Sequence, residues 1–456
     1  MAALIGREFS AEVLAMAAGM DEDTLVPSLD ELWRRRIVRE KGAASGGGTY
    51  DFSHDKIREV AARSVSPARR RQLHLRIATA LERTSPIPVT AAAAPRSVQI
   101  AAHYQRAGAA ERAATWYRSA ANAAALLHAN TQAIALLDQA LGLLGSLPES
   151  PRRDALELEM RTARLAPLAS VEGYASPGVS ATQRRARELT EALGVDEAPS
   201  LLRSLALSAL SGSDFTSATR YGQRLRAAGE RDDVLAVEAA YVLGIAAFWQ
   251  AEFATARHHF ELAVTRYRPA DRRTHLIRYG QDPKVVCLSR LGNTLWFLGL
   301  PDDARAARSA GLAWAEEIAH PYSRAAAMVF AALLALDMDD DAELRRYTEA
   351  LAAAEPEAPP VRLATDALLG SVAVLDGAAG EGIAAIRAAI QRIGAQERAP
   401  GLAASLGRIL LAACQAAGDA TAVIAAAGAL LEQGGAACVW APQARRAHAA
   451  FPGSRG

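Results

Sequence analysis

The lysines decide whether this chain could hold a nucleotide through a phosphate-binding loop. Such a loop needs a lysine followed by serine or threonine after a glycine-rich turn, because that lysine and the loop's N–H groups hold the phosphates. The residues that follow the three lysines are Gly42, Ile57 and Val285. The chain therefore contains no phosphate-binding loop, and the glycines at 46–48 indicate a flexible turn instead.

No residue pattern for metal or nucleophilic chemistry stands out either. His258 and His259 are adjacent and lack the i, i+4 spacing of a helical zinc pair. Serines and histidines are scattered through predicted helices, with no strained turn to present a nucleophile. We therefore predict no catalytic residue, no metal site, no cofactor and no enzyme activity for this polypeptide.

One polar segment remains as a candidate site. Arg278, Tyr279, Gln281 and Asp282 precede Pro283, where the helical repeat described below has an insertion. These residues either face a ligand or form a structural loop. The structural role is favoured, because an Asp-Pro turn with a buried tyrosine can join two repeats.

The composition favours helices. Hydrophobic residues make up 51% of the chain, and alanine and leucine dominate them. These residues lose little entropy in a helix, and small alanines let neighbouring helices approach closely. The formal net charge of +1 gives no general attraction to nucleic acid or to an anionic membrane.

The N-terminal residues, the longest apolar run and the cysteines indicate the cellular compartment. Residues 7–12 contain one arginine and two glutamates, so no signal peptide is predicted. The longest apolar run, Ala325 to Leu336, is shorter than the roughly 18 residues that span a bilayer. Cys287, Cys414 and Cys438 form no metal or disulfide pattern. We expect a cytoplasmic protein without membrane contact.

Residues 1–84 predict a small domain of helices and a hairpin. Phe9 to Met16 is expected to form one helix and residues 21–33 another. Ile37–Arg39 and Thr49–Phe52 have a β-like composition around a glycine-rich loop, which predicts a hairpin or wing. Ser53 can cap the next helix. This order is typical of a winged helix, and residues 85–96, rich in proline and alanine, are predicted to be a linker.

From about 97 to 450 the sequence predicts repeated helix pairs of the tetratricopeptide type. That repeat places small residues where helices approach and a large residue in the gap between them. Residues 144–200 fit the period poorly, and Val171–Val179 is expected to be an irregular loop. The anchors predicted in the second helix of each pair are Ala218, Ala256, Ala304, Ala342, Gly382 and Ala422. The predicted fold class is an all-α tetratricopeptide-like solenoid preceded by a small winged-helix-like domain with a short β-hairpin.

Four segments together resemble bacterial signal-transducing ATPases of the STAND class, which include transcriptional activators and relatives fused to nucleotidyl cyclases. Residues 2–9 (AALIGREF) and 50–60 (YDFSHDKIREV) are similar to the winged helix of that class. Residues 101–108 (AAHYQRAG) and 278–283 (RYGQDP) resemble its helical-repeat arm. The resemblance extends over roughly residues 1–400.

In that class, an effector domain and an ATPase core precede the winged helix and the arm. This chain shows neither, so we expect a fragment, the product of a truncated gene, or a stand-alone arm. The resemblance also implies a nucleotide-sensor role for His54 and Asp55, since a His-Asp pair at this place in related ATPases contacts the β-phosphate. The other interpretation is that both occupy a helix's first turn, where the helix dipole favours Asp55.

The resemblance implies a non-catalytic regulatory and interaction module. Its solenoid would bind a protein or peptide, with a small-molecule inducer as a further candidate. The winged helix would couple that binding to an ATPase domain in signal transduction or transcription regulation. The alternative is a transcription regulator whose winged helix binds DNA through Arg34–Arg36 and Arg69–Arg71, although residues 1–84 have a net charge of only +2.

Overall fold

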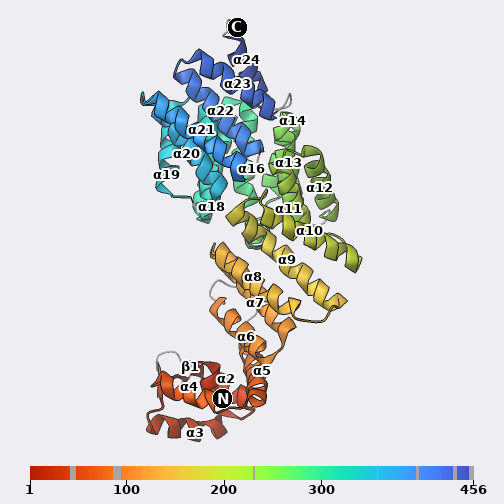
Figure 1. Ribbon diagram of the computed structural model, residues 1–456, viewed down its shortest axis with the longest axis vertical. Helices are drawn as coiled ribbons and strands as arrows, with labels where there is room; N and C mark the ends of the chain where they lie inside the picture. Colours follow the sequence, from red (N-terminus) through yellow and green to blue (C-terminus); the bar gives the residue numbers. More distant parts are fainter. Residues whose placement is uncertain are drawn as a thin grey trace. The chain divides into compact units, whose positions relative to one another are not determined.

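The computed structural model of the protein describes residues 1–41, 48–85, 94–229, 232–356, 358–396, 400–434 and 439–450. The chain divides into two compact units, Met1–Met160 and Arg161–Gly456. Helices dominate both units, as the composition predicts (Figure 1). The predicted glycine-rich turn lies largely outside the described residues, as do residues 86–93 of the predicted linker.

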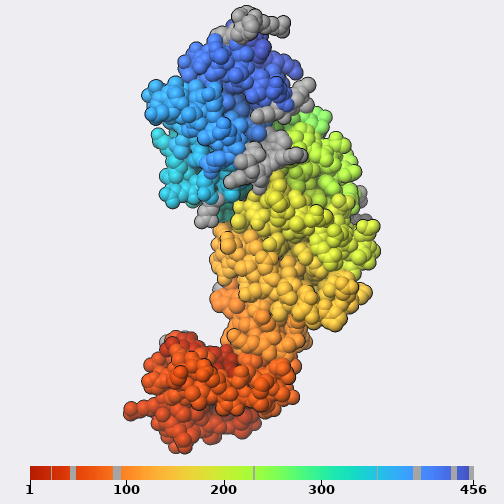
Figure 2. Space-filling view, viewed as in Figure 1, coloured from red at the N-terminus to blue at the C-terminus, as the bar shows by residue number. Residues whose placement is uncertain are grey.

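The first unit begins with five helices and a small sheet. In Figure 2 the red N-terminal residues form one compact body. The sheet has the order β1-β3-β2 with both pairs antiparallel, so β2 and β3 form the predicted hairpin. The elements are α1 (Ala2–Ile5), β1 (Glu8–Ser10), α2 (Ala11–Ala18), α3 (Glu22–Arg34), β2 (Val38–Glu40), β3 (Thr49–Phe52), α4 (Asp55–Arg63) and α5 (Pro67–Arg83).

The third strand corrects the prediction for Phe9. This residue belongs to β1, where it pairs with Tyr50 of β3, and its side chain is buried. The helix predicted from Phe9 begins only at Ala11, after Ser10 accepts a hydrogen bond from the Val13 N–H at 3.2 Å. Serine is a favoured cap because its hydroxyl satisfies an N–H that the first turn leaves free.

The rest of the first unit is helical. α5 packs on α6, α6 on α7 and α7 on α8, so the chain continues as neighbouring helices after the sheet. Ala101 of α6 and Ala113 of α7 are fully buried between them. The elements are α6 (Ala94–Ala107), α7 (Ala110–Leu126), α8 (Asn130–Gly145) and the first part of α9 (Pro151–Glu172).

The second unit is a stack of helix pairs. From α11 onward each pair has a first helix, A, that packs on the A helices before and after it. The A helices are α11, α13, α16, α18, α20 and α22. The elements are the rest of α9, α10 (Pro177–Leu193), α11 (Pro199–Ser211), α12 (Phe215–Ala228), α13 (Asp233–Trp249), α14 (Phe253–Arg266), η3 (Pro269–Asp271), α15 (Arg272–Tyr279), α16 (Pro283–Phe297), α17 (Pro301–Ile318), α18 (Pro321–Asp337), α19 (Asp341–Ala353), α20 (Pro359–Leu375), α21 (Ala379–Gln396), α22 (Pro400–Ala416), α23 (Ala420–Gly434) and α24 (Ala441–Ala449).

The predicted irregular loop at 171–179 is wrong in extent. α9 continues to Glu172, and α10 begins at Pro177. Ser176 caps α10 by accepting the Val179 N–H at 3.1 Å, and proline suits the first helical position because its missing N–H would have no partner there. Only four residues separate two long helices, so the poor fit to the repeat period reflects helix length.

Five of the six predicted anchors are buried, and Ala342 is not. Ala218, Ala256 and Ala304 each occupy the fourth position of the second helix in a pair. α19 begins at Asp341, so its fourth position is Leu344. Leu344 is only 1% exposed. The prediction placed the anchor two residues too early, on the exposed side of the helix.

Glycine permits a close helix contact between α20 and α21. A Cβ atom on Gly370 of α20 would lie 2.7 Å from the Gly382 carbonyl oxygen, and one on Gly382 would lie 2.3 Å from the Gly370 carbonyl oxygen. Neither distance is attainable without moving backbone. The small residues at these two positions therefore fix the spacing between α20 and α21.

We expect Gly370→Ala to destabilise the second unit by about 1–3 kcal/mol, because the added methyl group forces two backbones apart. Gly428→Ala in α23 is the matched control, since a Cβ there meets nothing within 4 Å. It should stabilise the chain by roughly 0.5–1 kcal/mol through helix propensity. Denaturant unfolding of the full-length chain measures both changes, and equal effects at the two glycines would refute the packing argument.

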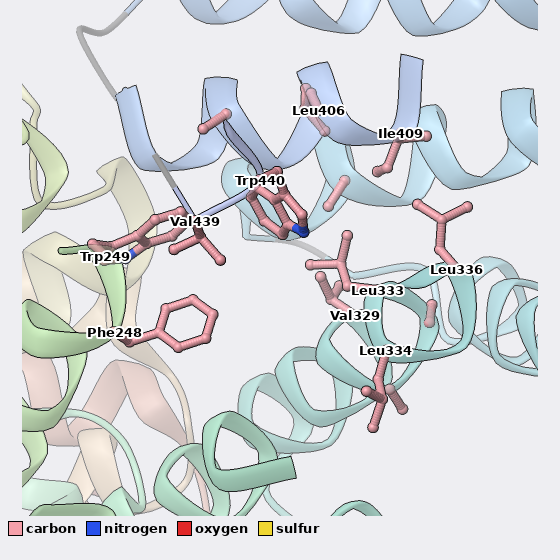
Figure 3. Close-up of a cluster of buried hydrophobic side chains, with 14 of the residues drawn as sticks. Phe248, Trp249, Val329, Leu333, Leu334, Leu336, Leu406, Ile409, Val439 and Trp440 are labelled. Carbon is pink, nitrogen blue, oxygen red and sulfur yellow. The ribbon is translucent and has the colours of Figure 1, made fainter. Parts of the chain in front are cut away.

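The C-terminal helices pack back onto earlier A helices. α22 contacts α11 and α18 in addition to its neighbours in the stack. The ring of Trp440 meets that of Trp249 edge to face, with centroids 5.9 Å apart, and Figure 3 shows Trp440 between Trp249 and Leu333. Its indole Nε1 donates to Asp337 at 3.1 Å, and Arg408 pairs with the same carboxylate at 2.9 Å. The C-terminal helices thus cover Trp249 of α13 and Asp337 of α18.

Candidate functional site

A buried ion pair joins the first two A helices of the second unit. Arg203 of α11 and Glu238 of α13 approach to 2.7 Å, and their side chains are 2% and 0% exposed. His275 of α15 donates from Nδ1 to the other oxygen of Glu238, also at 2.7 Å. α11 and α13 are mainly apolar along their length, so the pair lies between two largely hydrophobic helices.

The surroundings keep both members of this pair charged. Burial raises the pKa of Glu238, but Arg203 and His275 outweigh burial and hold that pKa below its usual value. Burial lowers the pKa of Arg203, and the Glu238 carboxylate again outweighs it, so that the net pKa is raised. Arg203 also donates to the Tyr174 hydroxyl at 2.9 Å and lies over the ring of Tyr241. At neutral pH, the core of the second unit contains a fixed guanidinium–carboxylate pair.

The polar segment at 278–283 joins α15 to α16 beside this pair. Tyr279 is 2% exposed and its carbonyl faces Arg203, while Arg278 is exposed and does not join the cluster. Gln281 donates from Nε2 to the Tyr241 hydroxyl at 2.7 Å. The structure therefore brings Tyr279 and Gln281 together at this site and leaves Arg278 on the surface.

Asp282 has a structural position at the start of α16. Its Oδ1 accepts the N–H of Lys284 and of Val285, at 3.0 and 3.2 Å, which caps the helix. Its Oδ2 accepts the Tyr267 hydroxyl at 2.6 Å, and the Trp314 indole donates to Oδ1 at 3.3 Å. The side chain is fully buried. These bonds use the whole carboxylate within the protein.

A second buried arginine has no such partners. Arg290 of α16 is 8% exposed and lies over the rings of Phe330, Phe248 and Trp249, at 4.3, 4.9 and 5.1 Å from their centroids. Its Nε is buried without a hydrogen bond among the described residues. Burial lowers the pKa of Arg290 to about 10, which still leaves it charged at neutral pH. Three residues later, Asn293 has a buried and unpartnered Oδ1.

His54 and Asp55 belong to the first unit and lie on its surface. The predicted cap at Ser53 is wrong: His54 occupies the cap position of α4, and no side chain accepts a hydrogen bond there. Asp55 is the first helical residue and pairs with Arg7 at 3.3 Å and with Arg58 at 3.7 Å. Both candidate residues remain accessible to a molecule outside the chain.

One arginine of each basic triplet makes a contact within the first unit. Arg34, Arg35 and Arg36 are exposed, but Arg35 pairs with Glu31 at 2.6 Å. In the second triplet, Arg70 turns inward and donates to the Val65 carbonyl at 3.0 Å. Arg35 and Arg70 therefore already interact with other groups of the first unit.

The buried charges Arg203, Glu238, His275 and Arg290 escaped the sequence-based prediction. For Arg203, Glu238 and Arg290 the signal in the sequence is a charged residue within a mainly apolar helix, which must be paired, stabilised by aromatic rings or neutralised when buried. Within the described parts of the chain, no three histidine, cysteine or carboxylate side chains gather as a metal site would require. The helices described include none with the length and hydropathy to cross a bilayer.

Comparisons with known proteins support the fold. No family model matches the sequence. An uncharacterised protein of Rhizobium meliloti (strain 1021) is 27% identical over 316 residues, which is 67% of this chain and 29% of that protein. The chain thus spans less than a third of that relative's length.

Among solved structures, a Rap protein complexed with competence and sporulation factor is similar with a TM-score of 0.51 and 13% identity, over 74% of this chain and 95% of that one. A STAND protein with a tetratricopeptide repeat sensor from Pyrococcus horikoshii matches with a TM-score of 0.40 and 12% identity, over 98% of this chain and 64% of that one. The predicted all-α, tetratricopeptide-like repeat fold is confirmed.

Proposed function

We propose that this chain is the regulatory arm of a larger signal-transducing protein and that its second unit binds a ligand. The observation that carries the proposal is the set of buried polar groups with unused hydrogen-bonding capacity on the inner A helices, Arg290 and Asn293 foremost. Helical-repeat proteins use their inner face to bind partners. A protein, a peptide or a small-molecule inducer fits such a face.

The surface of the first unit supports a link to a further domain. α4 buries none of its residues, and Val60 on it is 61% exposed. Trp33 and Val26 of α3 are 57% and 50% exposed. Several large apolar side chains exposed on one small module are typical of a surface that another domain covers. The greater length of the Rhizobium meliloti relative is consistent with further domains in such proteins.

We propose that the covering domain is an ATPase core and that the first unit holds a winged-helix-like domain at residues 1–84. The β2–β3 hairpin after α2 and α3 has the order of a wing. His54 and Asp55, exposed at the start of α4, would then contact the bound nucleotide's phosphate. In this arrangement, ligand binding to the repeat unit would reach the ATPase through the first unit.

The test is capture of partners from a lysate of the source organism by the full-length chain, with ADP, with ATP and without nucleotide. We expect a phosphate-loop ATPase to be enriched, and its recovery to change between ADP and ATP. His54→Ala should abolish the nucleotide dependence. Lys56→Ala, in the same turn with a side chain that is 81% exposed, is the matched control and should leave it unchanged.

Recovery that identifies no phosphate-loop ATPase in any of the three conditions would refute the coupling to an ATPase switch. Equal nucleotide dependence in His54→Ala and the unmodified chain would refute the sensor role alone. Salt-sensitive retention of duplex DNA by the full-length chain, lost when the Arg34–Arg36 triplet is replaced by glutamine, would instead support the transcription-regulator alternative.

A further inference from the structure

A charged side chain without an ion-pair partner lies inside the second unit. Within the described residues, Arg290 forms no ion pair and its Nε is buried without a hydrogen bond, and the residue is 8% exposed. Phe330, Phe248 and Trp249 surround it with their rings. Ring faces attract a cation, but they do not use the directional N–H donors of a guanidinium.

An unused acceptor lies beside these unused donors. Asn293 is three residues after Arg290 on α16, so both side chains lie on the same face of that helix. Asn293 donates from Nδ2 to the Phe330 carbonyl at 3.4 Å, which leaves its Oδ1 buried and unpartnered. Arg290 also approaches Phe330, at 4.3 Å from the ring centroid. The two side chains therefore present a donor and an acceptor in one place, between α16 and α18.

Among the described residues, no carboxylate pairs with Arg290, and two buried carboxylates of the second unit are already held elsewhere. Glu238 is held by Arg203 on one oxygen and by a histidine on the other. Asp282 is used by the Tyr267 hydroxyl and by the first turn of α16. This part of the second unit therefore retains one positive charge that the described residues do not balance. Native proteins rarely leave buried polar groups unpaired, so an unpaired buried group calls for an explanation, and a functional role is one of them.

The shape and charge of Arg290 and Asn293 indicate which kind of ligand they could bind. A guanidinium offers planar, paired donors that match the two oxygens of a carboxylate. A phosphate carries more charge and generally recruits further cations or a helix N-terminus, and Arg290 lies in the middle of α16 with no second unpaired cation described beside it. Asn293 Oδ1 requires an N–H donor next to the carboxylate. An acylated amino acid, or the C-terminal residue of a peptide, has both groups on the same carbon atom, Cα.

We propose that Arg290 and Asn293 form the recognition site for a terminal carboxylate and its neighbouring N–H, the end of a peptide or an N-acyl amino acid. The proposal rests on the proposed function only in taking the second unit as the ligand-binding part. Trp249 lies over Arg290 and also meets Trp440, so an entering ligand must shift this aromatic pair. Binding should therefore change tryptophan fluorescence.

The experiment titrates the full-length chain with short peptides that end in a free carboxylate, each beside the same peptide with a C-terminal amide. N-acetyl-leucine and succinate form the small-molecule arms, and tryptophan fluorescence and thermal melting are the readouts. We expect free-carboxylate ligands to bind at least ten times more tightly than their amides. N-acetyl-leucine should bind more tightly than succinate, which has no N–H for Asn293. Tighter binding of the peptides than of N-acetyl-leucine would identify a peptide end as the source.

Two variants separate recognition from folding. Arg290→Met keeps the length of the side chain without its charge and should fold, yet lose the preference for the carboxylate. Arg257→Met, an exposed arginine on α14, is the matched control and should behave like the unmodified chain. Equal affinity for carboxylate and amide ligands in the unmodified chain, or no binding of any probe, would overturn the proposal whatever Arg290→Met does. If a lysate partner is still captured in that case, the proposed function survives and only this inference fails.

Discussion

Glu238→Ala is expected to destabilise the second unit by about 3–5 kcal/mol, because it leaves the Arg203 guanidinium buried without its counter-charge. The pair is separated by 2.7 Å and almost completely enclosed, so water cannot replace the lost carboxylate. Denaturant unfolding of the full-length chain, followed by tryptophan fluorescence, measures the loss as a shift of the transition midpoint. Arg203→Met should lower the free energy of unfolding by a similar amount, since it leaves the Glu238 carboxylate buried without its guanidinium partner.

A surface pair of the same unit provides the control. Arg257 and Glu261 of α14 approach to 2.8 Å, but their side chains are 43% and 46% exposed. Glu261→Ala should therefore change the free energy of unfolding by no more than about 0.5 kcal/mol. The double variant Arg203→Met, Glu238→Leu should recover most of the loss, because apolar groups of similar size can replace a buried pair. If Glu238→Ala and Glu261→Ala cost the same, the pair is not buried as described.

Helix content and the close-packing glycines were predictable because both depend on local patterns. Helix positions follow from the spacing of apolar residues, and the repeat pattern that gave Gly382 as an anchor indicates where a neighbouring helix approaches. The strand at Glu8–Ser10 was not predictable in this way, since three residues show no period and its hydrogen bonds go to a strand some forty residues later. The prediction of Ala342 as a buried anchor was wrong, because a shift of two residues in the start of a helix changes which residues lie on its buried face.

The candidate site was only half predictable, for a related reason. Gln281 and Asp282 interrupt the repeat, so they stood out as a segment. Glu238 and Arg290 lie inside helices that keep the expected period, and their partners are distant in sequence. A buried charge is specified by what surrounds it in three dimensions. The sequence shows only that a charged residue occurs within a mainly apolar helix.

A buried pair of histidines should make the stability of the first unit depend on pH. His74 of α5 and His103 of α6 are 5% and 1% exposed, and their Nδ1 atoms lie 2.9 Å apart. His103 Nε2 faces the Ile5 carbonyl at 3.3 Å, so this nitrogen carries the proton and Nδ1 is the acceptor. His74 must then donate from its own Nδ1. Both rings are neutral in this arrangement, and a proton added at His103 Nδ1 would face the N–H of His74 Nδ1.

Acidification from pH 7 to pH 5 should therefore destabilise the first unit by about 2–4 kcal/mol. Burial lowers the pKa of each ring from 6.5 to about 4, with further lowering by Arg106 at His74 and by His74 at His103. The unfolded chain takes up these protons near pH 6.5, whereas the folded chain resists until about pH 4. The stability that the neutral pair contributes is thus complete above pH 6.5 and is lost as pH falls toward 4.

Hydrogen exchange of the α5 and α6 amides in the full-length chain, corrected for intrinsic exchange rates, measures this loss as a lower free energy of opening at pH 5. The variant His74→Leu, His103→Gln keeps a donor for the Ile5 carbonyl but cannot titrate, so its opening energy should change much less between the two pH values. His258→Gln, on the exposed side of α14, is the matched control and should retain the full pH dependence. An identical pH response in the double variant and the unmodified chain would mean that other groups cause it, and that the buried histidine pair can accept a proton without disturbing the packing of α5 on α6.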